Sequence, residues 1–114
     1  MKCCPKDETL KREWLGKLER KSKNIPEEKV SDICNFSKVL SHPLRVKIAL
    51  LLSEGDHCVC ELVSILKENQ NLVSHHLSIM KNYRVISSHN QSKYKYYTIK
   101  KEASDYLGIL VEKR

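Results

Sequence analysis

The chain has 114 residues, 31% of them charged, and a mean hydropathy of −0.50. This length supports one domain with a modest core rather than two. No apolar run approaches the roughly 20 residues that a membrane-spanning helix needs, so we expect no membrane partner. Residues 1–7 lack the apolar stretch of a secretory signal, and we therefore expect a cytoplasmic protein.

The net charge of +7 is unevenly distributed along the chain. Residues 67–101 contain seven lysines and arginines but a single acidic residue, whereas residues 30–66 contain three basic and four acidic residues. A basic charge confined to one third of a chain is typical of a surface that binds phosphates. A solvated basic surface has the same composition, so this pattern favours a nucleic acid as partner only together with other features.

Three helices are predicted in the first half of the chain. The first runs over residues 5–21, and its apolar stripe contains Leu10, Trp14, Leu15 and Leu18. The second begins at Pro26 and ends near Leu40, with the following residues facing inward: Val30, Ile33, Cys34, Phe36 and either Val39 or Leu40. The third, residues 44–53, is almost wholly apolar and is predicted to be central and buried, with Gly55 as its left-handed cap.

A short helix is predicted over residues 60–66, followed by a helix over residues 70–82 with Asn69 as its N-cap. Apolar spacing in the second of these gives an inward face of Val73, His76, Leu77 and Met80. We interpret His76 as a packed core histidine. The polar side chains that face outward are Gln70, Asn71, Ser74, His75, Ser78 and Lys81.

A β-hairpin is predicted next, with strands at residues 85–89 and 94–99 and a turn at residues 90–92. A last helix begins at Lys101 and carries Leu107, Leu110 and Val111 on its apolar side. This order of elements predicts a mainly α fold with a small β-hairpin, the winged helix-turn-helix. We expect residues 1–25 to form an N-terminal helix or arm and residues 26–114 to form the winged domain.

The predicted fold gives the polar helix a DNA-binding role. A helix start that is rich in Gln, Asn and Ser suits hydrogen bonding to base edges and phosphates in the major groove of duplex DNA. Lys93 and Lys95 of the hairpin can lie along the neighbouring backbone. We therefore predict that these two lysines and the six outward residues of the polar helix contact DNA.

The five cysteines have an unusual arrangement, because Cys58 and Cys60 lie one residue apart at the start of the short helix. An odd number of cysteines fits no closed set of bridges, and unexported proteins rarely have disulfide frameworks. Metal binding, redox sensing and simple burial remain, and burial is predicted for Cys34. Residues two apart on an α-helix point about 200° apart, so both thiols can bind one ion only if the helix start is extended or unwinds.

The chain resembles the ArsR/SmtB family of metal-sensing winged-helix repressors over roughly residues 36–99. The resemblance is carried by motifs in the family's order, namely Leu40-Ser41-His42-Pro43-Leu44-Arg45-Val46-Lys47-Ile48, Cys58-Val59-Cys60-Glu61-Leu62, Val73-Ser74-His75-His76-Leu77 and Tyr96-Tyr97. It implies a homodimer with the first and last helices at the interface, bound to a two-fold symmetric double-stranded operator. Two departures from the family are Arg84, where glycine is usual, and Ser92-Lys93 in place of a Gly-Arg wing tip.

The resemblance also implies an effector for the thiols. Family members that sense arsenic, cadmium or lead have Cys-Val-Cys at the position of Cys58 and Cys60. One arsenic subtype has a third cysteine where this chain has Val63, whereas the cadmium/lead subtype adds N-terminal cysteines, for which Cys3 and Cys4 are the candidates here. No cofactor is required, and As(III), Cd(II) or Pb(II) is the expected regulatory ion.

These observations predict a transcriptional repressor that releases operator DNA when a thiophilic ion binds Cys58 and Cys60. One alternative is a redox-sensing repressor that forms a disulfide between these thiols, or between either of them and Cys34. A second alternative is a constitutive DNA-binding protein with inert cysteines. An enzyme is not expected, because the chain has no Gly-rich loop and no paired carboxylates.

Overall fold

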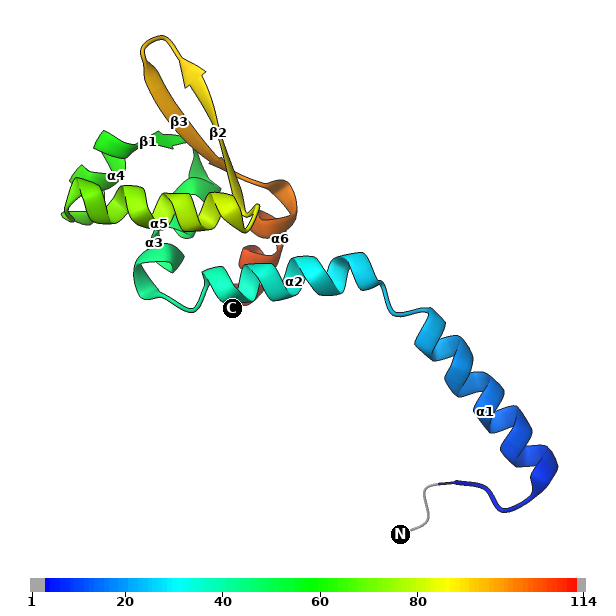
Figure 1. Ribbon diagram of the computed structural model, residues 1–114. Helices are drawn as coiled ribbons and strands as arrows, with labels where there is room; N and C mark the ends of the chain where they lie inside the picture. Colours follow the sequence, from blue (N-terminus) through cyan, green and yellow to red (C-terminus); the bar gives the residue numbers. More distant parts are fainter. Residues whose placement is uncertain (1–3, 113–114) are drawn as a thin grey trace. The chain divides into compact units, whose positions relative to one another are not determined.

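The computed structural model describes residues 4–112 (Figure 1). The chain divides into two compact units, Met1–Ser31 and Asp32–Arg114, and the boundary falls within helix α2 (Glu27–Val39). No helix among the described residues is long and apolar enough to cross a membrane.

The first unit contains helix α1 (Glu8–Lys23), which begins where Asp7 accepts hydrogen bonds from the backbone N–H groups of Thr9 and Leu10. This N-cap places the start of the helix three residues later than the sequence predicts. None of the residues of α1 is buried. In the predicted apolar stripe Trp14 is half-buried, whereas the leucines are exposed, with Leu10 at 56%.

The second unit is built around helix α3 (Pro43–Glu54), followed by α4 (Val59–Leu66), α5 (Gln70–Asn82) and α6 (Lys101–Leu110). Pro43 occupies the first turn of α3, and Nδ1 of His42 caps that turn by accepting from the N–H of Leu44 at 3.2 Å. One core joins these helices to the sheet. Its fully buried members include Ile48, Leu62, Val73, Leu77, Met80 and Ile86.

The sheet has three antiparallel strands in the order β1-β3-β2. Strands β2 (Ile86–Gln91) and β3 (Tyr94–Ile99) form the predicted hairpin, which extends past the helices of this unit (Figure 1). The sequence does not predict β1 (His57–Cys58), whose residues pair with Tyr97 and Tyr96 of β3. The winged helix-turn-helix prediction is confirmed, with this short strand added to the hairpin.

Three local predictions are wrong. Gly55 has φ 168°, which is extended backbone rather than a left-handed cap. The hairpin turn lies at residues 92–93 rather than 90–92, because Asn90 and Gln91 continue β2 in register with Lys95 and Tyr94. On α2, only Phe36 and Val39 are buried. The remaining apolar positions predicted to face inward on α2 are exposed in the described chain, namely Val30, Ile33 and Cys34.

Candidate functional site

Helix α5 presents the polar face that the sequence predicts. Asn69 begins the helix by accepting hydrogen bonds from the N–H groups of Asn71 at 2.7 Å and Leu72 at 3.3 Å. Val73, His76, Leu77 and Met80 are buried, as predicted. Among the predicted DNA-contacting residues of this helix, Ser74 is half-buried and the others are exposed, namely Gln70, Asn71, His75, Ser78 and Lys81.

Arg84 ends α5 in the conformation that glycine would adopt more easily. Its φ is 60°, and its N–H donates to the carbonyl of Lys81 at 3.0 Å, while the N–H of Val85 donates to the carbonyl of Met80 at 3.0 Å. This pair of bonds is the Schellman ending of a helix. The departure from the family pattern thus keeps the usual geometry but forces a residue with a Cβ into the left-handed region.

The wing brings basic and aromatic side chains together. Lys93 and Lys95 are exposed, and their Nζ atoms lie 5.7 Å from the ring centroids of Tyr94 and Tyr97, respectively. Lys81 Nζ donates to Ser88 Oγ of β2 at 2.8 Å. Lys81 therefore connects α5 to the wing, a role that periodicity in the sequence does not reveal.

Arg45 connects three elements of the second unit. Its Nε donates to the carbonyl of Val39 at 2.9 Å, its Nη2 lies 3.3 Å from the carbonyl of Lys38 and from Ser41 Oγ, and its Nη1 lies 3.3 Å from Nδ1 of His76. The ring of His42 lies 4.4 Å from that of His76. Burial lowers the pKa of His76, and the neighbouring charges of His42, Arg45 and His75 lower it further.

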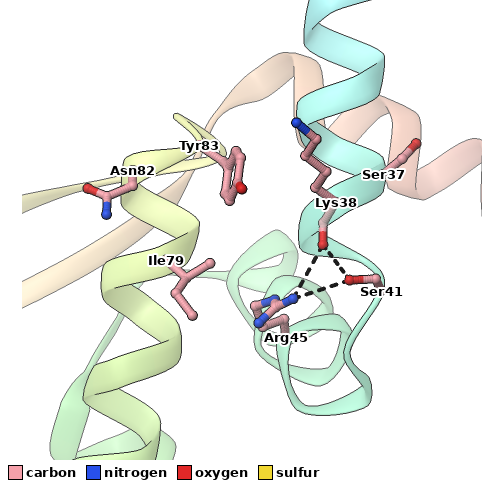
Figure 2. Close-up of a pocket in the computed structure, with 7 residues that line it drawn as sticks. All are labelled: Ser37, Lys38, Ser41, Arg45, Ile79, Asn82 and Tyr83. Carbon is pink, nitrogen blue, oxygen red and sulfur yellow. Dashed lines mark hydrogen bonds between the residues drawn. The ribbon is translucent and has the colours of Figure 1, made fainter.

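An open groove with a volume of about 840 Å³ lies beside Arg45 (Figure 2). It is lined from α2, α3 and the C-terminal end of α5, by Ser37, Lys38, Ser41, Arg45, Ile79, Asn82 and Tyr83. The ring of Tyr83 faces Lys38 across the groove, with Nζ 5.7 Å from the ring centroid. The lining contains two basic side chains and no acidic one.

The paired thiols occupy different environments at the start of α4. Cys58 is the N-cap residue, with extended backbone (φ −88°, ψ 168°), and its N–H donates to Glu61 Oε1 at 3.1 Å. This backbone bond is the main cause that lowers the pKa of Glu61, with a further contribution from His57, whose Nδ1 lies 3.3 Å from the same oxygen. Cys58 is 8% exposed, whereas Cys60 is exposed.

The remaining predicted ligands, Cys3 and Cys4, precede the second unit in the chain. Cys4 is exposed and belongs to the first unit, and Cys3 lies outside the described residues. Within residues 4–112, no group of three or more His, Cys, Asp or Glu side chains is arranged to hold a metal ion. Cys58 and Cys60 alone therefore do not form a three-ligand site in this part of the chain.

Comparisons with known proteins match part of this chain to one family model and to one curated relative. Residues 42–88 match the model described as "Bacterial regulatory protein, arsR family". Over 51 residues the chain is 39% identical to a cadmium resistance transcriptional regulatory protein CadC homolog from Staphylococcus aureus, and this match covers 44% of the chain and 42% of that relative. The chain thus spans less than half of the curated relative.

Two solved structures have the same fold as this chain. The transcriptional repressor PagR of Bacillus anthracis is 28% identical with a TM-score of 0.65, over 74% of this chain and 98% of PagR. A homodimeric winged helix-turn-helix DNA-binding domain from Mycobacterium bovis is 18% identical with a TM-score of 0.66, over 74% of this chain and 79% of that one. This chain therefore has the winged helix-turn-helix fold, and its residues 42–88 match the arsR family model.

Proposed function

We propose that this chain is a DNA-binding transcriptional repressor. The observation that carries the proposal is the outward face of α5, which is polar and basic. This helix begins at the Asn69 N-cap, and Lys81 near its end bonds to the wing that carries Lys93 and Lys95. A helix of this kind fits the major groove, and basic wing residues fit the phosphate backbone. The likeness to PagR, which is described as a transcriptional repressor, supports the same role.

The DNA-binding proposal is tested by comparing affinity for a selected operator with affinity for unselected duplex, which separates contacts to bases from contacts to phosphates. Replacing Ser74 and His75 by alanine should weaken binding to an operator selected from a random duplex pool far more than binding to unselected duplex. Replacing Lys93 by alanine should weaken both by the same factor, because phosphate contacts carry no sequence information. Equal losses on both duplexes for the α5 variants would show that α5 does not read bases.

We further propose that binding of a thiophilic ion to Cys58 and Cys60 lowers operator affinity. The extended backbone at Cys58 supports this, because the two thiols are not fixed 200° apart as they would be inside a helix. No unwinding of α4 is then required. Cys58 also belongs to β1, which is paired with wing strand β3. Drawing its buried thiol toward an ion strains this pairing and disturbs the wing.

The ion in this proposal is As(III), Cd(II) or Pb(II), which prefer three or more thiolate ligands. Two thiols leave its coordination incomplete, so at least one further ligand must be supplied. Cys3 and Cys4, from the same chain or from a second copy, are the proposed source. The CadC homolog, described as a cadmium resistance regulator, supports a soft ion over a hard one.

The experiment titrates arsenite, Cd(II), Pb(II) and Zn(II) while sulfur-to-metal absorbance and operator anisotropy are read on one sample. We expect absorbance and operator release to rise together, and both to be lost in the Cys58→Ser, Cys60→Ser double variant. Cys34→Ser is the matched control and should behave as the unmodified chain does. Ion binding that leaves operator affinity unchanged would refute the coupling.

A disulfide switch is the second candidate, and the exposure of Cys34 and Cys60 supports it. A hydroperoxide would oxidise two thiols to one disulfide, and its two oxygens would take up the two protons, which gives an alcohol and water, or two waters from hydrogen peroxide. If peroxide releases the operator in the presence of a chelator, and Cys34→Ser prevents that release, the redox assignment replaces the ion assignment.

A further inference from the structure

Helix α5 has two distinct flanks beside its outward face. At about 100° per residue, Asn71, His75, Ser78 and Asn82 form one stripe along the centre of that face. Lys81 lies on one side of this stripe, where it bonds to Ser88 of the wing. Ile79 and Tyr83 lie on the other side, where they line the groove with Lys38.

The groove is continuous with the stripe that is proposed to read DNA. Asn82, the last residue of the stripe, is itself part of the groove lining (Figure 2). A helix that lies in the major groove has a phosphate backbone on each side of it. The wing covers only one of the two flanks of α5, so the groove lies where the second backbone would pass.

The charge of the groove suits an anion. The C-terminal carbonyls of α2 carry partial negative charge, but Arg45 binds the carbonyls of Lys38 and Val39 and offsets it. Ser41 Oγ also donates to the carbonyl of Lys38 at 2.7 Å. Arg45 and these carbonyls are thus occupied with one another, whereas Lys38 Nζ extends into the opening beside Tyr83.

We propose that this groove binds a phosphate of the DNA backbone, with Lys38 as the contacting cation and Asn82 and Tyr83 as neighbouring hydrogen-bond donors. The inference rests on the proposed DNA binding and extends it. Each domain would then hold the backbone on both sides of α5, through the wing on one side and through the end of α2 on the other. Free inorganic phosphate has the same chemistry as a backbone phosphate and is the competing ligand for this groove.

The test measures duplex affinity of the full chain against salt concentration for Lys38→Gln, Lys38→Arg and the control Lys47→Gln. Lys47 is exposed on α3 and does not line the groove. Loss of one phosphate contact should reduce the slope of log affinity against log salt by about 0.9 per bound domain. We expect this for Lys38→Gln on operator and random duplex alike, whereas Lys38→Arg and Lys47→Gln should keep the original slope.

The inference is overturned if Lys38→Gln keeps the original slope, or if Lys47→Gln changes it as much. Absence of duplex binding by the unmodified chain would instead refute the proposed function itself. A second arm titrates inorganic phosphate at constant ionic strength and follows the amide signals of Ser41 and Tyr83. Shifts that Lys38→Gln abolishes, with an unchanged DNA slope, would assign the groove to a free anion and overturn the backbone contact.

Discussion

At the scale of single residues, Arg84 holds a strained backbone conformation. The left-handed region costs a residue with a Cβ roughly 1–2 kcal/mol, and glycine recovers this but adds roughly 0.5–1 kcal/mol of chain entropy to the unfolded state. Arg84→Gly should therefore raise the free energy of unfolding by about 0.5–1 kcal/mol in urea titrations. Arg84→Ala keeps the Cβ and should give no gain. An equal gain from both variants would assign the effect to the arginine side chain instead of the backbone.

Single residues also show where the sequence misleads. Lys67, Arg84 and Ser92 have φ in the left-handed region, whereas none of the glycines does. Left-handed positions in this chain therefore do not follow its glycines, and Gly55, which the sequence predicts to be a left-handed cap, has extended backbone. The hairpin turn lies later than the sequence predicts, because Asn90 is of a type that favours turns, but Asn90 and Gln91 pair with β3.

At the scale of secondary-structure elements, the contact between α3 and α5 depends on the protonation of His76. Its pKa is lowered by burial and then by His42, Arg45 and His75, so the unfolded chain binds more protons than the folded one. Wherever that holds, stability rises with pH, and it should fall as the pH drops below about 6.5, the ordinary value for histidine.

The free energy of unfolding, measured between pH 8 and pH 5.5, should show this fall in the unmodified chain and a shallower one in His76→Gln. His89→Gln is the control, because His89 is an exposed wing residue. Parallel curves for the unmodified chain and His76→Gln would contradict the assignment.

Elements with strong periodicity were predictable and short ones were not. The bounds of α5 follow from the Asn69 cap and from apolar residues at helical spacing, and both are present as expected. Strand β1 has two residues, which are too few to show an alternation of apolar and polar side chains in the sequence. The outward polar face of α5 was therefore predictable from the sequence. The inclusion of Cys58 in the wing sheet, the contacts of Arg45 and the groove at Lys38 were not, because they depend on tertiary pairing.

At the scale of the whole molecule, the end of α6 exposes apolar surface that its own unit does not cover. Ile109 is 70% and Leu110 67% exposed, whereas Leu107 is buried in its own core. The family resemblance implies that a second copy covers this end. Burial of one such side chain contributes about 1.5–3 kcal/mol, so Leu110→Glu should shift the chain from dimer to monomer in sedimentation equilibrium.

Operator affinity should fall in parallel, because two half-sites would no longer be bound as one unit. Ile65→Glu provides the matched control, since Ile65 is 47% exposed on α4. If the Leu110→Glu variant is still a dimer, the dimer interface does not include the end of α6.

The unequal exposure of the two thiols gives the proposed response an order in time. In the proposed response, the exposed Cys60 would meet an arriving ion directly, whereas the buried Cys58 would bind only after a local opening at β1, which is paired with β3. The rate of the second step is then set by the free energy of that opening rather than by the ion concentration. An ion that binds Cys60 briefly would dissociate without disturbing the wing. Only an ion that remains bound to Cys60 until β1 opens would be bound by both thiols. The chain would thereby respond to persistent exposure and ignore transient contact.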